Sequence, residues 1–240
     1  MELVLLEPGG YVSDINPADA LRTPTTALES DPRSDRDEDA LASRWQAIAA
    51  LYFGPEVPES VAIHFETAKN VLLYAFFVYR FHMVAEQYVL STLELALRER
   101  LLRDNLIQVK DDWVPGLKLM MGRARDHKLI SNDRFEPGRA LARRRAEHRH
   151  SVELIRRMQQ EGLTEVSYDP AQIELTAEDL SFDWIKQFTD SLPDLRNMHA
   201  HGTSNLYPTV FNTFRTVHNL VGQMFSASAP ADPAPNYSAE

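Results

Sequence analysis

Residues 60–103 read SVAIHFETAKNVLLYAFFVYRFHMVAEQYVLSTLELALRERLLR and contain neither glycine nor proline. Their apolar side chains recur at the three- and four-residue spacing of a helix that packs into a core, as at Phe65, Leu72, Leu93 and Leu101. We therefore predict a long helix over this range, with a break near residues 80–86 left open. Its first half is apolar on nearly every side, which predicts a central position in the core.

Helical patterns cover most of the remaining chain, at residues 40–52, 111–130, 139–162, 181–192 and 206–225. Convincing strand patterns are few, so the sequence predicts an all-α helical bundle. Pro193 is expected to end one helix and to start another that runs into residues 195–202. The arginine-rich residues 139–162 have few apolar side chains, which favours a solvated helical arm.

The sequence divides into three parts. Residues 1–59 form an acidic N-terminal extension with one short helix, and this part carries most of the net charge of −10. Residues 60–225 form the bundle, interrupted by an arginine-rich insertion at about residues 131–180. Residues 226–240 are rich in proline, alanine and serine and predict a disordered tail. Most of residues 8–36 also lacks a core-forming pattern, so we expect a loop that the bundle does not need in order to fold.

Composition excludes several kinds of chemistry. The 240 residues include no cysteine, which rules out disulfides, thiolate catalysis and cysteine-ligated zinc. This fits a reducing compartment, and the first residues lack the pattern of a signal peptide, so we expect a cytoplasmic protein. The most apolar stretch, residues 71–79, is shorter than the roughly 20 residues that span a membrane, so no membrane partner is expected. Patterns for phosphate loops, dinucleotide binding and H-E-x-x-H zinc sites are absent.

The motif with the most side chains capable of acid–base or phosphate chemistry is LRNMHAHG at residues 195–202. Asn197 and His201 are four residues apart and share one face of a helix, with Arg196 beside them. Gly202 suits the position that follows a helix, which places His201 in the last turn. A cation, an amide and an imidazole at one helix end are suited to handling a phosphate, although the same pattern also occurs in purely structural helix caps.

Two stretches of this chain resemble the HEPN superfamily of small α-helical bundles. Residues 83–98, MVAEQYVLSTLELALR, are similar to the long early helix of that family, and residues 195–202 match its R-N-x-x-x-H motif at every specified position. Residues 111–130 are similar to the second bundle helix. The likeness covers residues 60–130 and 181–225, whereas the acidic extension and the arginine-rich insertion depart from the minimal family pattern.

The resemblance implies a metal-independent endoribonuclease without a cofactor, in which the motifs of two subunits meet across a two-fold axis. Carried over to this chain, the catalytic residues are Arg196, Asn197 and His201. The RNA supplies its own nucleophile, the 2′-hydroxyl, while His201 transfers protons and Arg196 stabilises charge on the phosphorane. Asn197 orients His201 or the phosphate. Many members of the family act in toxin–antitoxin or antiphage systems, so RNA, a second copy of the chain and an antitoxin or regulatory protein are the expected partners.

Three residues are candidates for supporting roles. His199 lies two residues before His201, so the two side chains point about 200° apart on a helix and are poor co-ligands for one metal. His199 is therefore interpreted as a packing or supporting residue, and His64 as structural. Glu86 and Glu94 can face the motif and orient Arg196 through an ion pair, with at least one of them expected to be solvated instead.

An RNA-binding surface is predicted in the insertion, where phosphate contacts would come from Arg143, Arg144, Arg145 and Arg149. No aromatic side chains alternate with these arginines to stack on bases, so a solvated arm or a contact with the acidic extension is an equal alternative. Two further functions stay open: a non-catalytic HEPN-like module that binds RNA, nucleotide or protein, and a helical interaction protein in which the motif is coincidental.

Overall fold

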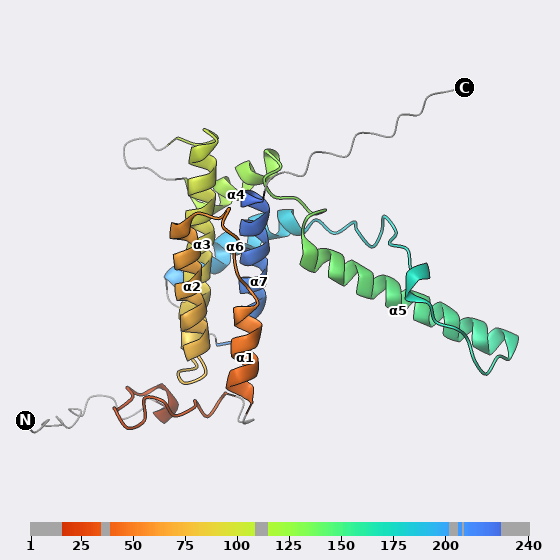
Figure 1. The fold of residues 1–240 in the computed structure, drawn as a ribbon, viewed down its shortest axis with the longest axis horizontal. Coiled ribbons are helices and arrows are strands. Elements are labelled where there is room, and N and C mark those ends of the chain that lie inside the picture. The colour runs from red at the N-terminus through yellow and green to blue at the C-terminus, as the bar shows by residue number, and fades with distance from the viewer. Residues whose placement is uncertain (1–15, 35–38, 109–114, 202–205, 208, 227–240) are drawn as a thin grey trace, which may run out of the picture.

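The computed structural model describes residues 16–34, 39–108, 115–201, 206–207 and 209–226. In this part of the chain all regular structure is helical, which confirms the all-α class (Figure 1). The α-helices are α1 Ala40–Ala49, α2 Glu59–Tyr74, α3 Phe81–Arg103, α4 Leu117–Asp126, α5 Glu136–Glu161, α6 Trp184–Ala200 and α7 Val210–Phe225. None of these helices is long and apolar enough to cross a membrane.

Helix α3 is the centre of the bundle, whereas the sequence predicts that position for the first half of residues 60–103, which is mostly α2. It packs against α2, α4, α6 and α7. Its inward side chains are fully buried, among them Val89, Leu90, Leu93, Leu97 and Leu101. Helix α7 supplies the opposite wall of the core. The face of α3 that meets α6 is therefore part of the packed core.

The helical range 60–103 is divided into two helices, because the chain turns at residues 75–80 and forms an antiparallel hairpin of α2 and α3. The break lies at the edge of residues 80–86, where the sequence left one open. Hydrogen bonds between Ser60 and Glu99 and between His64 and Thr92 join the two helices. No glycine or proline marks the turn. It is stabilised instead by the N-terminal segment, which satisfies backbone groups that the end of a helix leaves without partners.

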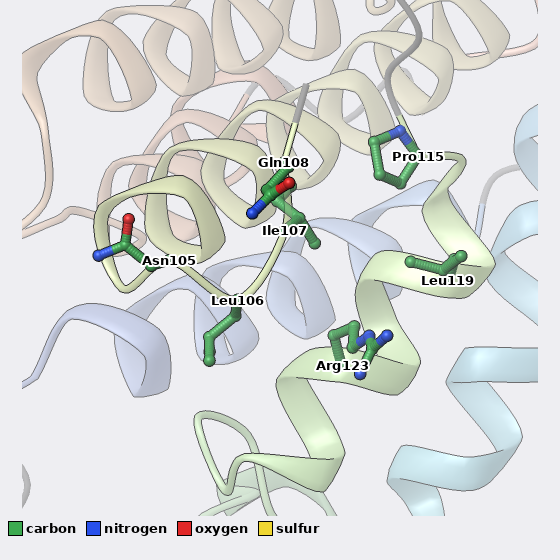
Figure 2. Close-up of a pocket in the computed structure, with 7 residues that line it drawn as sticks. All are labelled: Asn105, Leu106, Ile107, Gln108, Pro115, Leu119 and Arg123. Atoms are coloured by element: carbon green, nitrogen blue, oxygen red, sulfur yellow. The ribbon is translucent and has the colours of Figure 1, made fainter. Parts of the chain in front are cut away.

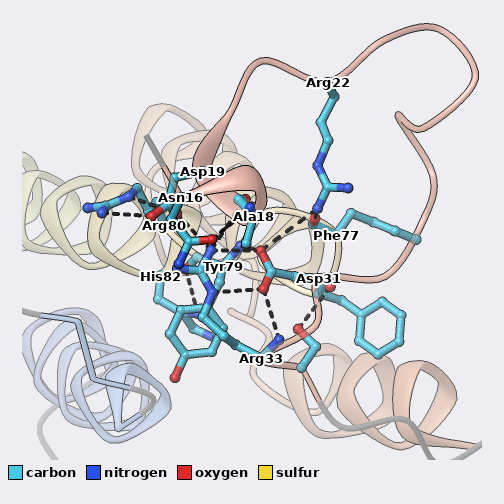
Figure 3. A network of polar contacts seen from close by, with 12 residues as sticks. Asn16, Ala18, Asp19, Arg22, Asp31, Arg33, Phe77, Tyr79, Arg80 and His82 are labelled. Carbon is cyan, nitrogen blue, oxygen red and sulfur yellow. Dashed lines mark hydrogen bonds and ion pairs between the residues drawn. The ribbon is translucent and has the colours of Figure 1, made fainter. Parts of the chain in front are cut away.

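That stabilising segment is residues 16–34 (Figure 3). The carboxylate of Asp31 accepts a hydrogen bond from the backbone N–H of Tyr79, at 3.1 Å. Arg22 donates to the carbonyl of Phe77 at 2.7 Å. Asp31 is completely buried, and Arg33 donates to its Oδ1 and Oδ2 at 2.8 and 2.9 Å. These residues are loop-like, as the sequence predicts, but polar contacts tie them to the hairpin. That the bundle folds without them stays a prediction.

Helix α5 forms the arm that the sequence predicts, and it projects from the bundle (Figure 1). Only Gly138, Ala142 and Ala146 of this helix are buried. A Cβ atom at Gly138 would lie 2.6 Å from the Trp184 ring, so glycine allows α5 to begin directly against α6. The helix ends at Gly162, whose φ of +66° is the left-handed conformation common after helices.

Two helix boundaries differ from the prediction. Pro193 lies inside α6, which runs unbroken from Trp184 to Ala200. Burial of Leu192 and Pro193 against the core offsets the hydrogen bond that proline cannot make. Helix α4 is shorter than the predicted range 111–130: it ends at Asp126, shortly before Lys128, whose φ is +56°. Residues 111–114 lie outside the described residues.

Candidate functional site

The last turns of α6 place Arg196 beside α3. Its Nε and Nη2 lie 3.2 and 3.3 Å from the two carboxylate oxygens of Glu94. This two-point contact fixes the plane of the guanidinium, as the sequence predicts for Glu94. The Arg196 side chain still keeps 39% of its surface exposed, so it can reach a ligand while Glu94 holds it.

A buried polar network fixes the same end of α6 from within. Glu86 and His199 are each 2% exposed, and His199 Nε2 lies 2.8 Å from the Glu86 carboxylate. Thr213 of α7 donates to the other Glu86 oxygen at 2.5 Å, and the Tyr207 hydroxyl lies 3.3 Å from His199 Nε2. Burial, together with a hydrogen bond to Glu86, raises the pKa of Tyr207 well above its ordinary value. Its phenol therefore stays protonated at neutral pH.

This network revises the roles predicted for the two glutamates and supports the one predicted for His199. His199 is a buried supporting residue, as expected. Glu86 neither contacts Arg196 nor faces solvent, because its carboxylate is taken up by His199 and Thr213. The expectation that at least one glutamate is solvated is wrong, since Glu94 is also partly buried.

Asn197 and His201 lie on the exposed side of the helix end. His201 is the C-cap of α6, and its backbone N–H donates to the Asn197 carbonyl at 3.0 Å. Its imidazole has no partner among the described residues, and Gly202 lies outside them. Arg196 and His201 are five residues apart, so they point about 140° apart around the helix axis. One chain therefore does not direct all three motif residues into one cavity.

Arg196 lines a groove of about 540 Å³ between α2, α3, α4 and α6. Polar side chains line much of it, and those outside the motif are His64, Ser91, Glu94 and Arg98. His64 is predicted to be structural, and the sequence alone does not mark Ser91 or Arg98 as site residues. Their spacing in the sequence is a signal for a shared surface, because Ser91, Glu94 and Arg98 lie on one face of a helix.

Two of the four arginines predicted to bind RNA are engaged within the arm. Arg143 donates to the carbonyls of Pro170 and Ile173, at 2.6 and 3.2 Å. Arg149 forms a two-point ion pair with Asp179 at 2.6 and 2.8 Å. Arg144 and Arg145 are exposed and form no ion pair with any residue that the structure describes. These two keep the guanidinium available for a phosphate.

A second pocket, of about 390 Å³, lies between the end of α3 and the start of α4 (Figure 2). Figure 2 shows Leu106, Ile107 and Leu119 around it, with Arg123 on its α4 side. Among the described residues, Arg123 is the one titratable side chain in its lining. These residues offer no acid–base pair, so the pocket is a weaker candidate than the groove at Arg196.

Across the described ranges, no group of three or more acidic or histidine side chains is placed to hold a metal ion. Comparison of the chain with models of protein families, with characterised proteins and with solved structures found no match. The functional assignment therefore rests on the motif and on the geometry around Arg196.

Proposed function

We propose that this protein is a metal-independent endoribonuclease of the HEPN type, with Arg196, Asn197 and His201 as its catalytic residues. The observation that carries the proposal is the ion pair of Arg196 with Glu94. It orients a partly exposed guanidinium at the edge of a polar groove, on the helix that ends in His201.

The proposed reaction is attack of a ribose 2′-hydroxyl oxygen on the adjacent phosphorus. The 2′-hydroxyl proton passes to a neutral His201, the new P–O2′ bond forms and the P–O5′ bond breaks. The 5′ oxygen leaves with a proton from an imidazolium, giving a 2′,3′-cyclic phosphate and a 5′-hydroxyl. Arg196 stabilises the charge on the phosphorane oxygens, and Asn197 donates a hydrogen bond to the phosphate.

The second part of the proposal is a homodimer. Arg196 and His201 diverge within one chain, so a two-fold axis near the end of α6 would pair Arg196 of one protomer with His201 of the partner subunit. An antitoxin or regulatory protein that covers this helix end would be the matching partner class.

The first experiment measures cleavage of single-stranded and structured RNA in EDTA. We expect His201→Ala and Arg196→Ala to abolish cleavage and the unmodified chain to leave cyclic phosphate ends. His127→Ala is the matched control, because His127 is an exposed C-cap histidine of α4. If the unmodified protein cuts no RNA, or if His201→Ala cuts as well, the nuclease proposal fails and the non-catalytic binding module takes its place.

The second experiment tests the shared site by mixing Arg196→Ala and His201→Ala chains under exchange conditions. A site that combines the two residues from different subunits regains one intact copy in the mixed dimer, so part of the activity returns. A site contained within one chain stays inactive in every combination. Light scattering that finds only monomer at micromolar concentration would contradict the homodimer.

A further inference from the structure

The groove at Arg196 holds a second cation besides the proposed catalytic arginine. Arg98 lines it from α3, is exposed and forms no ion pair within the described residues. Glu94 is already matched by Arg196, so the charge of Arg98 is not balanced inside the groove. The first turn of α4 begins at Gly116 on the same groove without a side-chain cap, which adds to the positive potential. The groove therefore favours an anionic group.

His64 brings an oriented hydrogen-bond acceptor to the same groove. Its ring stacks on Tyr88 with 4.2 Å between ring centres and 8° between planes, and its Nδ1 lies 3.0 Å from the Thr92 hydroxyl. Thr92 donates its single hydroxyl proton to the Tyr88 carbonyl, at 3.1 Å, so it accepts from His64. The proton of a neutral His64 therefore sits on Nδ1, and Nε2 carries the lone pair.

The surroundings of His64 keep that lone pair available. Burial lowers the pKa of His64 below its ordinary value, so the ring is neutral at pH 7. Nε2 has no partner among the residues described in the structure. A neutral imidazole whose free nitrogen is an acceptor is matched to a ligand that offers a hydroxyl proton.

We propose that this groove binds one nucleotide unit of single-stranded RNA, with Arg98 on the phosphate oxygens and His64 Nε2 accepting a hydrogen bond from the 2′-hydroxyl. This rests on the proposed ribonuclease function and assigns to its site the contact that distinguishes RNA from DNA. The volume of about 540 Å³ lies within the range of small-molecule sites.

The test is binding of fluorescent oligouridine and of oligodeoxyuridine, which differ only at the 2′ position, measured by anisotropy. The His201→Ala background keeps the RNA intact. Arg98→Gln is expected to lower the affinity for both ligands about tenfold, as the loss of a charged hydrogen bond does. It should also reduce the slope of log affinity against log salt concentration by about 0.7. Arg215→Gln is the matched control, because Arg215 is exposed on α7 away from the groove.

His64→Phe keeps the aromatic ring but removes the acceptor. It is expected to lower the affinity for oligouridine about fivefold, which is the effect of one hydrogen bond, and to leave the affinity for oligodeoxyuridine unchanged. If this variant does not fold, NMR of the His64 ring serves instead: its resonances should shift with oligouridine and not with oligodeoxyuridine.

Equal affinity for the two ligands in the parent chain, or an Arg98→Gln that behaves like Arg215→Gln, would overturn the proposal. Because binding is measured in the His201→Ala background, its outcome is separate from that of the cleavage assay. A chain that prefers oligouridine through Arg98 and His64 yet cuts no RNA would refute the nuclease and leave the binding groove intact.

Discussion

Two glutamates of α3 show how burial separates roles at the scale of single residues. Glu86 is enclosed and accepts hydrogen bonds from His199 and Thr213, whereas Glu94 is partly exposed and holds Arg196 alone. The first anchors the end of α6 within the core, and the second orients a side chain toward the groove. The same chemical group therefore serves stability at one position and orientation at the other.

Substitution of the two glutamates should separate these roles. Glu86→Ala leaves buried donors without an acceptor, and we expect a loss of about 3 kcal/mol in the free energy of unfolding in urea. Glu94→Ala removes a partly exposed ion pair and should cost less than about 1 kcal/mol, while lowering RNA cleavage at least tenfold because Arg196 loses its orientation. Equal losses of stability in the two variants would contradict this division.

Both glutamates could be identified from the sequence as candidates, but their separate roles could not be assigned from it. Glu86 is buried because Thr213 and Tyr207 close over it, and both lie more than a hundred residues further along the chain. Arg149 shows the same limit, since its partner Asp179 lies across the arm. The motif at Arg196 could be predicted because helical spacing alone relates its members, whereas the groove needs four helices to meet.

At the scale of elements, apolar periodicity predicted the helices well but not every point at which they begin and end. The turn between α2 and α3 has no glycine or proline, so its signal lies in the contacts that Asp31 and Arg22 make from outside the hairpin. Pro193 shows the reverse case, in which a local signal for a helix break is outweighed by burial of the helix.

The arm provides a prediction at this scale, because one ion pair joins α5 to the segment that returns along it. Asp179 also accepts from the backbone and hydroxyl of Thr176, and Arg149 lowers the pKa of Asp179 far below its ordinary range. Arg149→Ala should therefore speed amide hydrogen exchange in residues 163–183 and leave the unfolding temperature of the bundle unchanged.

Arg144→Ala is the control for the arm, since Arg144 is exposed on the same helix and makes no ion pair among the described residues. Equal exchange in the two variants would show that the return segment does not depend on Arg149. A fall of several degrees in the unfolding temperature would show that the bundle depends on the arm.

At the scale of the whole molecule, the N-terminal segment and the hairpin are joined through Asp31. Burial alone raises the pKa of Asp31, but hydrogen bonds from Arg33 and from the Tyr79 backbone outweigh it and hold the pKa at about 2. Because the folded value lies below the ordinary 3.8, the stabilisation is complete above that value and is lost as the pH falls through about 2.

Asp31→Asn should therefore lower the free energy of unfolding by about 2 kcal/mol at pH 7. The difference from the unmodified chain should shrink as the pH falls from 4 to 2, because protonation then removes the same charge. Denaturant unfolding at several pH values measures this, with Asp133→Asn, an exposed carboxylate, as the control. A difference that is independent of pH would contradict the assignment.

The projecting α5 arm has a consequence for hydrodynamic drag. A body with a long side arm has a larger Stokes radius than a sphere of equal mass, so a single chain of this shape leaves a gel-filtration column early (Figure 1). A mass read from the elution volume, calibrated on spherical standards, would be too high. A monomer would then be mistaken for a dimer. Sedimentation equilibrium, which reports mass without reference to shape, is the measurement on which the subunit count should rest.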